Sequence, residues 1–201
     1  MQVTVRGILL DIEGTTSSID FVYSEMFPFV RRELAEFLDN HWLSTEVQSA
    51  CHQIAQESAL ADGPVTATAI CRAVSGLLDT AATPNGSKQL QGLIWKSGFE
   101  SGELRAHLFD DVAPAMRTWH DAGVSIRIYS SGSVGAQKLF FGHTVAGNLL
   151  PLIDGNYDTT TGPKRDEASY RAIAADWDID PRDILFASDV PAELDAARAA
   201  G

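Results

Sequence analysis

Ile8-Leu9-Leu10-Asp11-Ile12-Glu13-Gly14-Thr15 is the stretch of this sequence that decides its fold. An apolar run that ends in an Asp and a Gly-containing turn is typical of a central strand that leads into a loop. The two carboxylates lie two residues apart, so they could offer a nucleophile and a proton donor to one substrate. A plain acidic turn would have the same pattern, and only the sequence farther along can separate the two interpretations.

Composition limits what kind of protein this is. With 201 residues, 45% of them hydrophobic, the chain can bury a substantial core and form one domain with an insertion or two modest domains. No apolar stretch is long enough to span a membrane, and no signal peptide pattern precedes the first strand, so we expect a cytoplasmic protein. Cys51 and Cys71 have no partner at a metal-ligand spacing, and we expect them to be reduced thiols.

The chain is strongly acidic, with a formal net charge of −12. Nucleic acid and anionic membranes both need clustered Lys and Arg, so neither is expected as a partner. A phosphate ester is still possible as a substrate. Its site would have to reverse the charge locally with a metal ion, a lysine and backbone N–H groups.

The first strand, expected at 3–10, is followed by a long stretch that reads as helical. Apolar positions recur at steps of three and four from Phe21 to Trp42, with an adjustment at Pro28. Further helices are expected at 45–59, 66–78 and 87–96, separated by breakers at 62–64 and 83–86.

After His107 strands and helices alternate. A helix at 112–122 precedes a strand at 124–129, and a helix, a short segment at 157–158 and a helix at 166–176 follow. The strand expected at 184–187 leads to a last helix at 191–201. This order predicts an α/β fold, a doubly wound parallel sheet with a Rossmann-type core, into which a helical domain is inserted after the first strand.

Polar side chains follow the expected strands where ligands bind in such a sheet. These are Asp11 and Glu13 after the first strand, Ser130 and Ser131 after the second, Lys164 in the loop 159–164, and Asp189 after the last strand. A carboxylate, a hydroxyl, a lysine and a second carboxylate are what magnesium-dependent phosphoryl transfer through an aspartyl-phosphate requires.

In this order the motifs resemble those of the haloacid dehalogenase superfamily, and more closely those of its enolase-phosphatases, the acireductone synthases of methionine salvage. The resemblance is specific because Glu13 stands where most of these phosphatases have Asp, and because Tyr129-Ser130-Ser131-Gly132-Ser133 follows. It spans nearly the whole chain, including Phe27-Pro28-Phe29, Leu90-Gln91-Gly92 with Trp95, and Gly162-Pro163-Lys164.

The resemblance implies a role for each of these residues. Asp11 would be the nucleophile that attacks phosphorus, and Glu13 the acid that protonates the leaving alkoxide and then activates water. One Mg²⁺ per chain would be held by Asp11, Asp189 and the backbone carbonyl of Glu13. Ser130, Ser131 and Lys164 would bind the substrate phosphate.

The resemblance also implies the domains and the reaction. Residues 1–16 and 108–201 would form the catalytic core, and 17–107 a helical cap that closes over the site and chooses the substrate. The substrate would be 2,3-diketo-5-methylthiopentyl-1-phosphate, enolised and then dephosphorylated to 1,2-dihydroxy-3-keto-5-methylthiopentene. We expect a monomer. Relatives continue with another strand and a tail past Gly201, so we expect this sequence to be a piece of a longer chain whose sheet lacks an edge.

Several alternatives stay open on the sequence alone. The chain could be a phosphatase of another small phosphoester, a dehalogenase that uses Asp11 without magnesium, or a non-catalytic phosphate-binding protein of the same fold. Ser130 and Ser131 could be ordinary turn residues, and Glu193 could either orient metal-bound waters or face solvent. The five histidines and four tryptophans are expected to be structural or exposed, with Trp95 a candidate for substrate contact.

Overall fold

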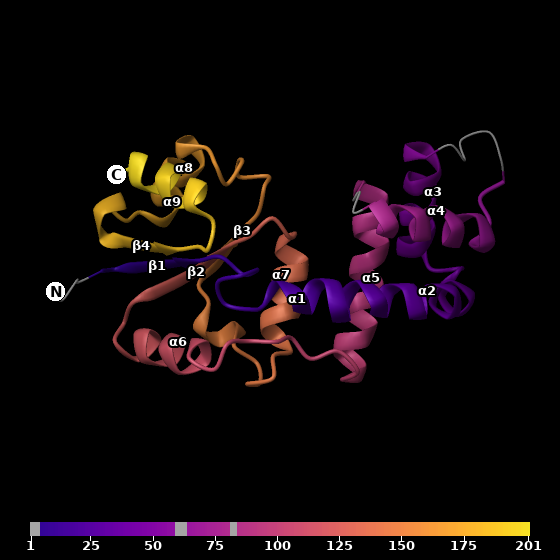
Figure 1. Cartoon of the computed structure of the whole chain (residues 1–201), viewed down its shortest axis with the longest axis horizontal. Coiled ribbons are helices and arrows are strands. Elements are labelled where there is room, and N and C mark those ends of the chain that lie inside the picture. The colour runs from indigo at the N-terminus through magenta and orange to yellow at the C-terminus, as the bar shows by residue number, and fades with distance from the viewer. Residues whose placement is uncertain (1–4, 59–63, 81–83) are drawn as a thin grey trace. The chain divides into compact units, whose positions relative to one another are not determined.

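A single parallel sheet organises the strand-bearing part of the chain. The computed structural model describes residues 5–58, 64–80 and 84–201 (Figure 1). Within these residues the strand order is β3-β2-β1-β4, and the strands are β1 (Gly7–Leu10), β2 (Ser125–Tyr129), β3 (Gly155–Tyr157) and β4 (Ile184–Ala187). Because β1 pairs with β2 on one side and with β4 on the other, the winding of the sheet reverses at β1. Such a switch point is where α/β sheets bind ligands.

Helices cover both faces of this sheet, which confirms the predicted doubly wound fold. The helices of this part are α6 (Val112–Asp121), α7 (Val134–Gly142), α8 (Glu167–Trp177) and α9 (Pro191–Ala199), with single turns η2 (Leu150–Leu152) and η3 (Pro181–Asp183). In Figure 1, α8 and α9 lie on one side of the strands and α6 on the other. Side chains alternate along a strand, so Leu9 packs in one core with Tyr129 and Ile173.

The chain divides into two compact units, one made of Met1–Phe21 and Arg105–Gly201 and the other of Val22–Leu104. The first carries the sheet. The second is helical, with a π-helical turn η1 (Val22–Met26) followed by α2 (Phe27–His41), α3 (Thr45–Glu57), α4 (Ala67–Thr80) and α5 (Asn85–Ser101). Apolar side chains at helical spacing fill its core, among them Leu38, Ile54, Val74 and Leu90.

The start of the first long helix differs from the prediction of one helix from Phe21. A short helix α1 (Ile19–Phe21) leads into the π-helical turn η1, and α2 then begins at Phe27 with Pro28 in its first turn. Proline is tolerated there because the first N–H groups of a helix have no partner within it. The expected adjustment at Pro28 is therefore a helix start, and the irregular turn lies just before it.

The breaker expected at 83–86 is wrong at its end, because Asn85 and Gly86 belong to α5. A Cβ on Gly86 would lie 2.6 Å from the backbone nitrogen of Ile54, so the glycine allows α5 to approach α3 closely. The Gly86 amide donates to Glu57 Oε2 at 2.9 Å, which satisfies one free N–H of the helix start. Thr83, and the breaker residues Asp62 and Gly63, lie outside the described residues.

The helix expected to end at residue 96 continues to Ser101 as α5, and the remaining differences are smaller. The expected first strand begins only at Gly7, its residues 3–4 lie outside the described part, and the last helix ends at Ala199.

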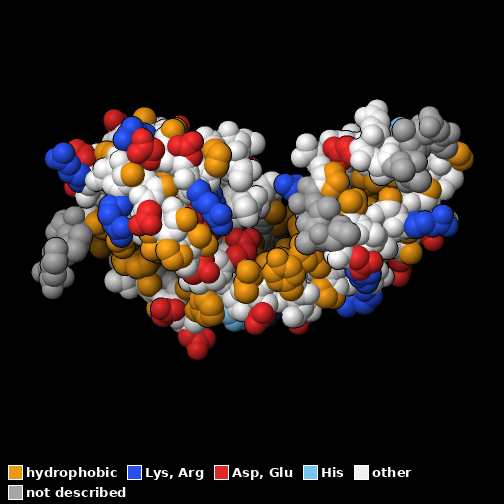
Figure 2. All heavy atoms as spheres, turned by 45° about the horizontal axis from the view of Figure 1, so that its top comes forward, with side chains coloured by type: hydrophobic (Ala, Val, Ile, Leu, Met, Phe, Trp, Pro, Cys, Tyr) orange, Lys and Arg blue, Asp and Glu red, His pale blue; other side chains and the backbone are white. Residues whose placement is uncertain are grey.

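Among the described residues no helix is long and apolar enough to cross a membrane. Cys51 and Cys71 are free thiols, as expected. On the face drawn in Figure 2, the Lys and Arg side chains are scattered among acidic and apolar ones.

Candidate active site

Three of the predicted site residues lie at the carboxyl edge of the sheet, next to the switch point. Asp11 directly follows β1, Ser130 directly follows β2, and Asp189 comes two residues after β4. Asp11 is only 3% exposed, and its amide donates to Ala187 O of the neighbouring strand β4. The sheet therefore fixes the backbone from which the Asp11 carboxylate projects.

The loop after Asp11 folds into a tight turn around one carbonyl. Ile12 O accepts hydrogen bonds from the amides of Thr15, Thr16 and Ser17 at 2.9 to 3.2 Å. Gly14 has a φ of +81°, in the left-handed region that favours glycine. These hydrogen bonds fold residues 15–17 back onto Ile12, and the compact turn keeps Glu13 close to Asp11.

Gly14 also makes room for Asp189. A Cβ on Gly14 would lie 2.2 Å from Asp189 Oδ2, so no larger residue fits while that carboxylate stays in place. Asp189 is tied to the same loop through its amide, which donates to Thr15 Oγ1 at 3.0 Å, and Thr15 Oγ1 in turn donates to Asp11 Oδ2 at 3.3 Å. The Asp189 carboxylate thus lies against the backbone of the loop that carries Asp11 and Glu13.

Lys164 joins two buried carboxylates. Its Nζ lies 2.5 Å from Asp11 Oδ1 and 2.8 Å from Glu193 Oε2, and its side chain is 10% exposed. Lys164 precedes α8 in a turn that is held by Tyr170, whose hydroxyl donates to Lys164 O at 2.6 Å. The ammonium therefore has a fixed place beside the Asp11 carboxylate.

Burial and these charges shift the protonation of the pair. Burial raises the pKa of Asp11 to about 6, even though the charge of Lys164 lowers it. Burial would lower the pKa of Lys164, but the charges of Asp11 and Glu193, with their hydrogen bonds, outweigh it and raise this pKa above its usual value. The lysine is thus a permanent cation at neutral pH, and Asp11 is a carboxylate that the protein interior makes more basic.

Glu13 and Ser130 contact one another across the two central strands. Ser130 is fully buried, and its hydroxyl donates to Glu13 Oε2 at 3.1 Å. The same Oγ accepts from the Gly132 amide at 3.1 Å. Ser131 does not join this network: it is exposed, and its side chain makes no hydrogen bond to the described residues.

Glu193 is the residue whose place the sequence left undecided. It is 7% exposed on the first turn of α9, and its Oε2 accepts from Ser188 Oγ at 2.8 Å as well as pairing with Lys164. The carboxylate therefore faces the site rather than solvent. Asp189 precedes α9, so helical spacing does not relate the two acids, and the sequence held no signal that Glu193 pairs with Lys164.

The donors near Asp11 suit a hard cation. Within the described residues, no group of three or more His, Cys, Asp or Glu side chains is placed to hold a metal. The predicted set needs only two carboxylates, Asp11 and Asp189, with the Glu13 carbonyl, and oxygen-only ligands are what Mg²⁺ prefers. The close packing of Asp189 on Gly14 brings the second carboxylate to this loop, so the residues present fit such an ion.

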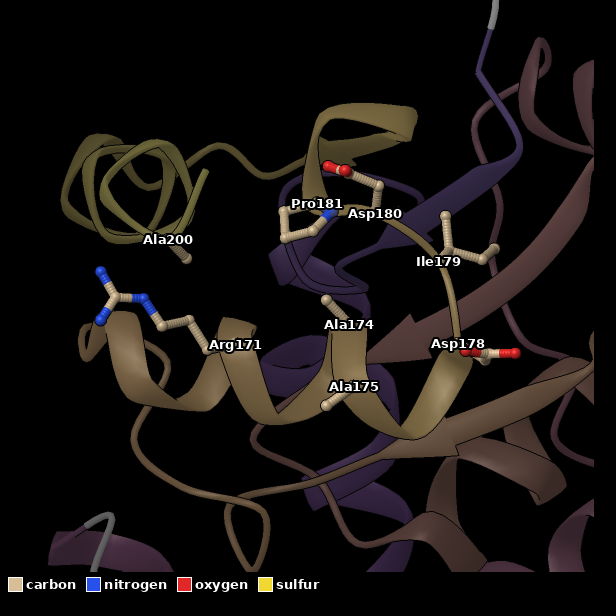
Figure 3. Close-up of a pocket in the computed structure, with 8 residues that line it drawn as sticks. All are labelled: Arg171, Ala174, Ala175, Asp178, Ile179, Asp180, Pro181 and Ala200. Carbon is tan, nitrogen blue, oxygen red and sulfur yellow. The ribbon is translucent and has the colours of Figure 1, made fainter.

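A separate groove lies at the other end of the strands. It has a volume of about 460 Å³ and is bounded by Arg171 and Ala174 of α8, the turn 178–181 and Ala200 (Figure 3). The turn precedes β4, whereas Asp189 follows it, so the groove is at the amino edge of the sheet. It contains none of the predicted site residues.

Comparisons with known proteins show which family the chain resembles. A sequence profile of haloacid dehalogenase-like hydrolases matches residues 5–201. The enolase-phosphatase E1 of Synechococcus elongatus is 45% identical, over 100% of this chain and 87% of that protein. The crystal structure of the UTR4 protein from Saccharomyces cerevisiae superposes with a TM-score of 0.83 and 30% identity, covering 98% of this chain and 88% of that one. The HAD-hydrolase YfnB from Bacillus subtilis, described as bound to magnesium, has a TM-score of 0.57 at 15% identity and covers 99% of this chain and 86% of that one.

Proposed function

The chain belongs to the enolase-phosphatase E1 family of the haloacid dehalogenase-like hydrolases, and we propose that it acts through Asp11 as nucleophile and Glu13 as acid and base. Its enolase-phosphatase function follows from full-length relatives at 42–45% identity, among them proteins of Sorangium cellulosum and Pseudomonas aeruginosa. The activity belongs to methionine salvage. The assignment of each residue is our proposal.

The contact between Asp11 and Lys164 is the observation that carries the residue assignment. Asp11 Oδ1 is held at 2.5 Å by the lysine ammonium, which leaves the other oxygen, Oδ2, near the Thr15 hydroxyl. A buried carboxylate with a raised pKa is a better nucleophile than a solvated one, because it has less hydration to lose. Lys164 would place its positive charge next to the equatorial oxygens of the phosphoryl group during attack.

Glu13 is suited to transfer protons to and from groups that react next to Asp11. It lies two residues from Asp11 in the same turn, and Ser130 orients one of its oxygens by a hydrogen bond of 3.1 Å. An acid so placed could protonate the leaving alkoxide and then take a proton from the water that hydrolyses the phosphoenzyme. Ser130 has a single hydroxyl hydrogen, so it would donate to the substrate phosphate by giving up its bond to Glu13. Ser131 is exposed and would contact the phosphate only at the edge of the site.

We propose that one Mg²⁺ is held by Asp11, Asp189 and the Glu13 carbonyl. When bound, such an ion neutralises phosphate charge and polarises a carbonyl oxygen as a Lewis acid. Lys164 already pairs with two carboxylates, Asp11 and Glu193, so without a further cation the site would offer a phosphate dianion little free positive charge.

The proposed substrate is the phosphorylated diketone 2,3-diketo-5-methylthiopentyl-1-phosphate. We propose that it is enolised first and dephosphorylated second, with residues 17–107 as the cap and with the chain acting as a monomer. Glu13, beside the nucleophile, is one candidate for proton transfer at the carbon next to the phosphate ester.

The test is turnover of the diketone phosphate against a panel of sugar and glycolytic phosphates, with and without EDTA. We expect phosphate release from the diketone phosphate at a kcat/KM well above the panel, and its loss in EDTA and recovery in excess Mg²⁺. Equal rates across the panel would instead favour a phosphatase of another small phosphoester. Activity on a haloacid that survives EDTA would indicate a dehalogenase, and binding of phosphate without turnover a non-catalytic protein.

A further inference from the structure

His107 lies where the chain re-enters the strand-bearing unit, and it contacts the segment by which the chain leaves it. Its Nδ1 lies 3.2 Å from the Ser18 amide nitrogen and 3.3 Å from Ser17 Oγ. All three residues belong to the same compact unit. The ring thus links two stretches of backbone that are about 90 residues apart in sequence.

The partners of Nδ1 indicate which nitrogen of the neutral ring carries the hydrogen. A backbone N–H can only donate, so Nδ1 must accept the hydrogen bond from Ser18 and carries no proton. The hydrogen of the neutral imidazole is then on Nε2. An imidazolium would point an N–H at the Ser18 N–H and lose this bond.

The segment around His107 is itself fixed, so Nδ1 is a rigid acceptor. The amide of Ala106 donates to His143 O, and Ala106 O accepts from the Val145 amide, both at 2.9 Å. On the other side, the Phe109 amide donates to Thr16 O at 3.1 Å, and the Phe109 ring packs edge-on against the imidazole. Hydrogen bonds therefore fix the backbone on both sides of His107.

The segment that His107 holds is continuous with the loop that carries Glu13. Ser17 O accepts from the Gly14 amide at 2.8 Å, and the Ser17 amide donates to Ile12 O at 3.0 Å. A shift of Ser17 and Ser18 would therefore move the backbone on both sides of Glu13. The Glu13 carboxylate meets Ser130 at 3.1 Å, so a small displacement would misplace it.

We propose that His107 is a positioning residue for Glu13, which it serves by holding the Ser17–Ser18 segment through an unprotonated Nδ1. This inference rests on the proposed role of Glu13 as acid and base. The imidazole does not touch the reacting atoms; it fixes the end of the turn from which Glu13 projects.

The experiment compares two amides that differ by one methylene. In His107→Asn the side-chain oxygen can take the place of Nδ1, whereas in His107→Gln it lies one bond farther out and misses the Ser18 amide. We expect His107→Gln to lower kcat by roughly 10- to 100-fold with KM little changed, since misplaced catalytic groups lose that order of rate. His107→Asn should retain most of the wild-type kcat, and His107→Leu should behave like the Gln variant. His120→Leu, an exposed histidine on α6, is the matched control and should leave kcat unchanged.

Two further measurements separate positioning from a loss of folding. Thermal unfolding of the Asn and Gln variants should differ far less than their kcat values do. In ¹⁵N spectra of the wild type, the His107 Nδ1 should give the signal of an unprotonated nitrogen, a result that needs no turnover.

Equal kcat for the Asn and Gln variants, or a proton on Nδ1 at the pH of the assay, would overturn the proposal even with an active wild type. If the Leu variant fails to fold, the Asn and Gln pair still decides. A wild type without phosphatase activity would instead refute the proposed function, and the role assigned to Glu13 with it.

Discussion

The Lys164 ammonium donates to the Asp11 carboxylate across 2.5 Å, although 153 residues separate them in sequence. The Lys164 side chain is 10% exposed and that of Asp11 4% exposed, so solvent weakens their interaction little. A lysine at this place has two effects. Its charge lowers the pKa of Asp11 and so opposes the effect of burial, which favours the protonated carboxyl group. It also supplies positive charge beside the nucleophile.

Lys164→Met should therefore lower kcat by about 10² to 10³, the order found when one charge-stabilising donor is removed. The variant should also raise the pKa of Asp11 further, because the charge of Lys164 lowers it in the wild type. Phosphate release at saturating substrate measures the first effect. Lys138→Met, an exposed lysine on α7, is the control, and a Lys164→Met kcat no lower than that of the control would contradict the assignment.

Glu193→Gln should lower kcat by roughly tenfold while the Mg²⁺ concentration for half-maximal activity stays nearly the same. The reason is that the Glu193 carboxylate is occupied by Lys164 and Ser188, so that it fixes the lysine. A magnesium titration at saturating substrate separates this role from one in orienting metal-bound waters. A large increase in the Mg²⁺ requirement with kcat unchanged would favour the waters. Asp195→Asn, two residues on and exposed, should change neither value.

The sequence predicted which polar residues follow the strands at the carboxyl edge of the sheet, but it did not predict which side chains contact those residues. Asp11, Ser130 and Asp189 could be placed because each follows an apolar strand, and parallel strands end at one edge. Glu193 could not be placed, because an acid on the first turn of a helix is usually solvated, and its partner Lys164 comes from a different loop. Periodicity within α9 contains no information about that loop.

Gly86 shows the same limit in the helical unit. Asn-Gly after a proline is a strong turn signal, yet here the glycine lies inside α5, where the α3 backbone passes too close for a Cβ. Ser131 is a different case. The Ser-Ser-Gly-Ser run does not distinguish its two serines, but strand β2 ends at Tyr129 and buries Ser130, which leaves Ser131 exposed.

Glu13→Gln should form the aspartyl-phosphate slowly and fail to hydrolyse it, with a loss on the order of 10² to 10⁴ in turnover, since the amide can neither protonate the leaving group nor activate water. The Glu13 carbonyl, which would bind the metal, is kept. Rapid quenching with acid, followed by detection of acid-stable, base-labile phosphate on the protein, measures the intermediate. Turnover within a few-fold of wild type would show that Glu13 is only a turn residue.

The stability of the metal-free protein should depend on the ionisation of Asp11. Burial raises the pKa of Asp11 from 3.8 to about 6, so the folded chain binds this proton more tightly than the unfolded chain does. The contribution to the free energy of unfolding is fully present below pH 4, is lost as the pH rises from about 4 to 6, and then levels off. The full loss is about 3 kcal/mol from the size of the shift.

Other carboxyl groups titrate in the same range, so Asp11→Asn is the reference. Denaturant unfolding of both proteins in EDTA, at steps from pH 4 to 7, gives the difference in their free energies of unfolding. We expect the wild type to lose stability relative to Asp11→Asn as the pH rises to about 6. A difference that is constant, or that grows in favour of the wild type, would contradict the raised pKa.

The last prediction separates the two steps of the reaction with Asp11→Asn. Attack on phosphorus needs the Asp11 carboxylate, so phosphate release should fall to background. Enolisation needs only the removal of a proton next to a polarised carbonyl, and Glu13, Asp189 and Lys164 are all retained in the variant. Asp11→Asn should therefore still form the phosphorylated enol when Mg²⁺ is high enough to compensate for one lost ligand. Ultraviolet absorbance follows the enol while a coupled assay follows phosphate, and calorimetry of Mg²⁺ binding confirms that the variant is loaded. Enol without phosphate in the loaded variant would support the proposed order, whereas a loaded variant that makes no enol would show that Asp11 also serves the first step. Phosphate release that precedes any enol signal in the wild type would contradict the order itself.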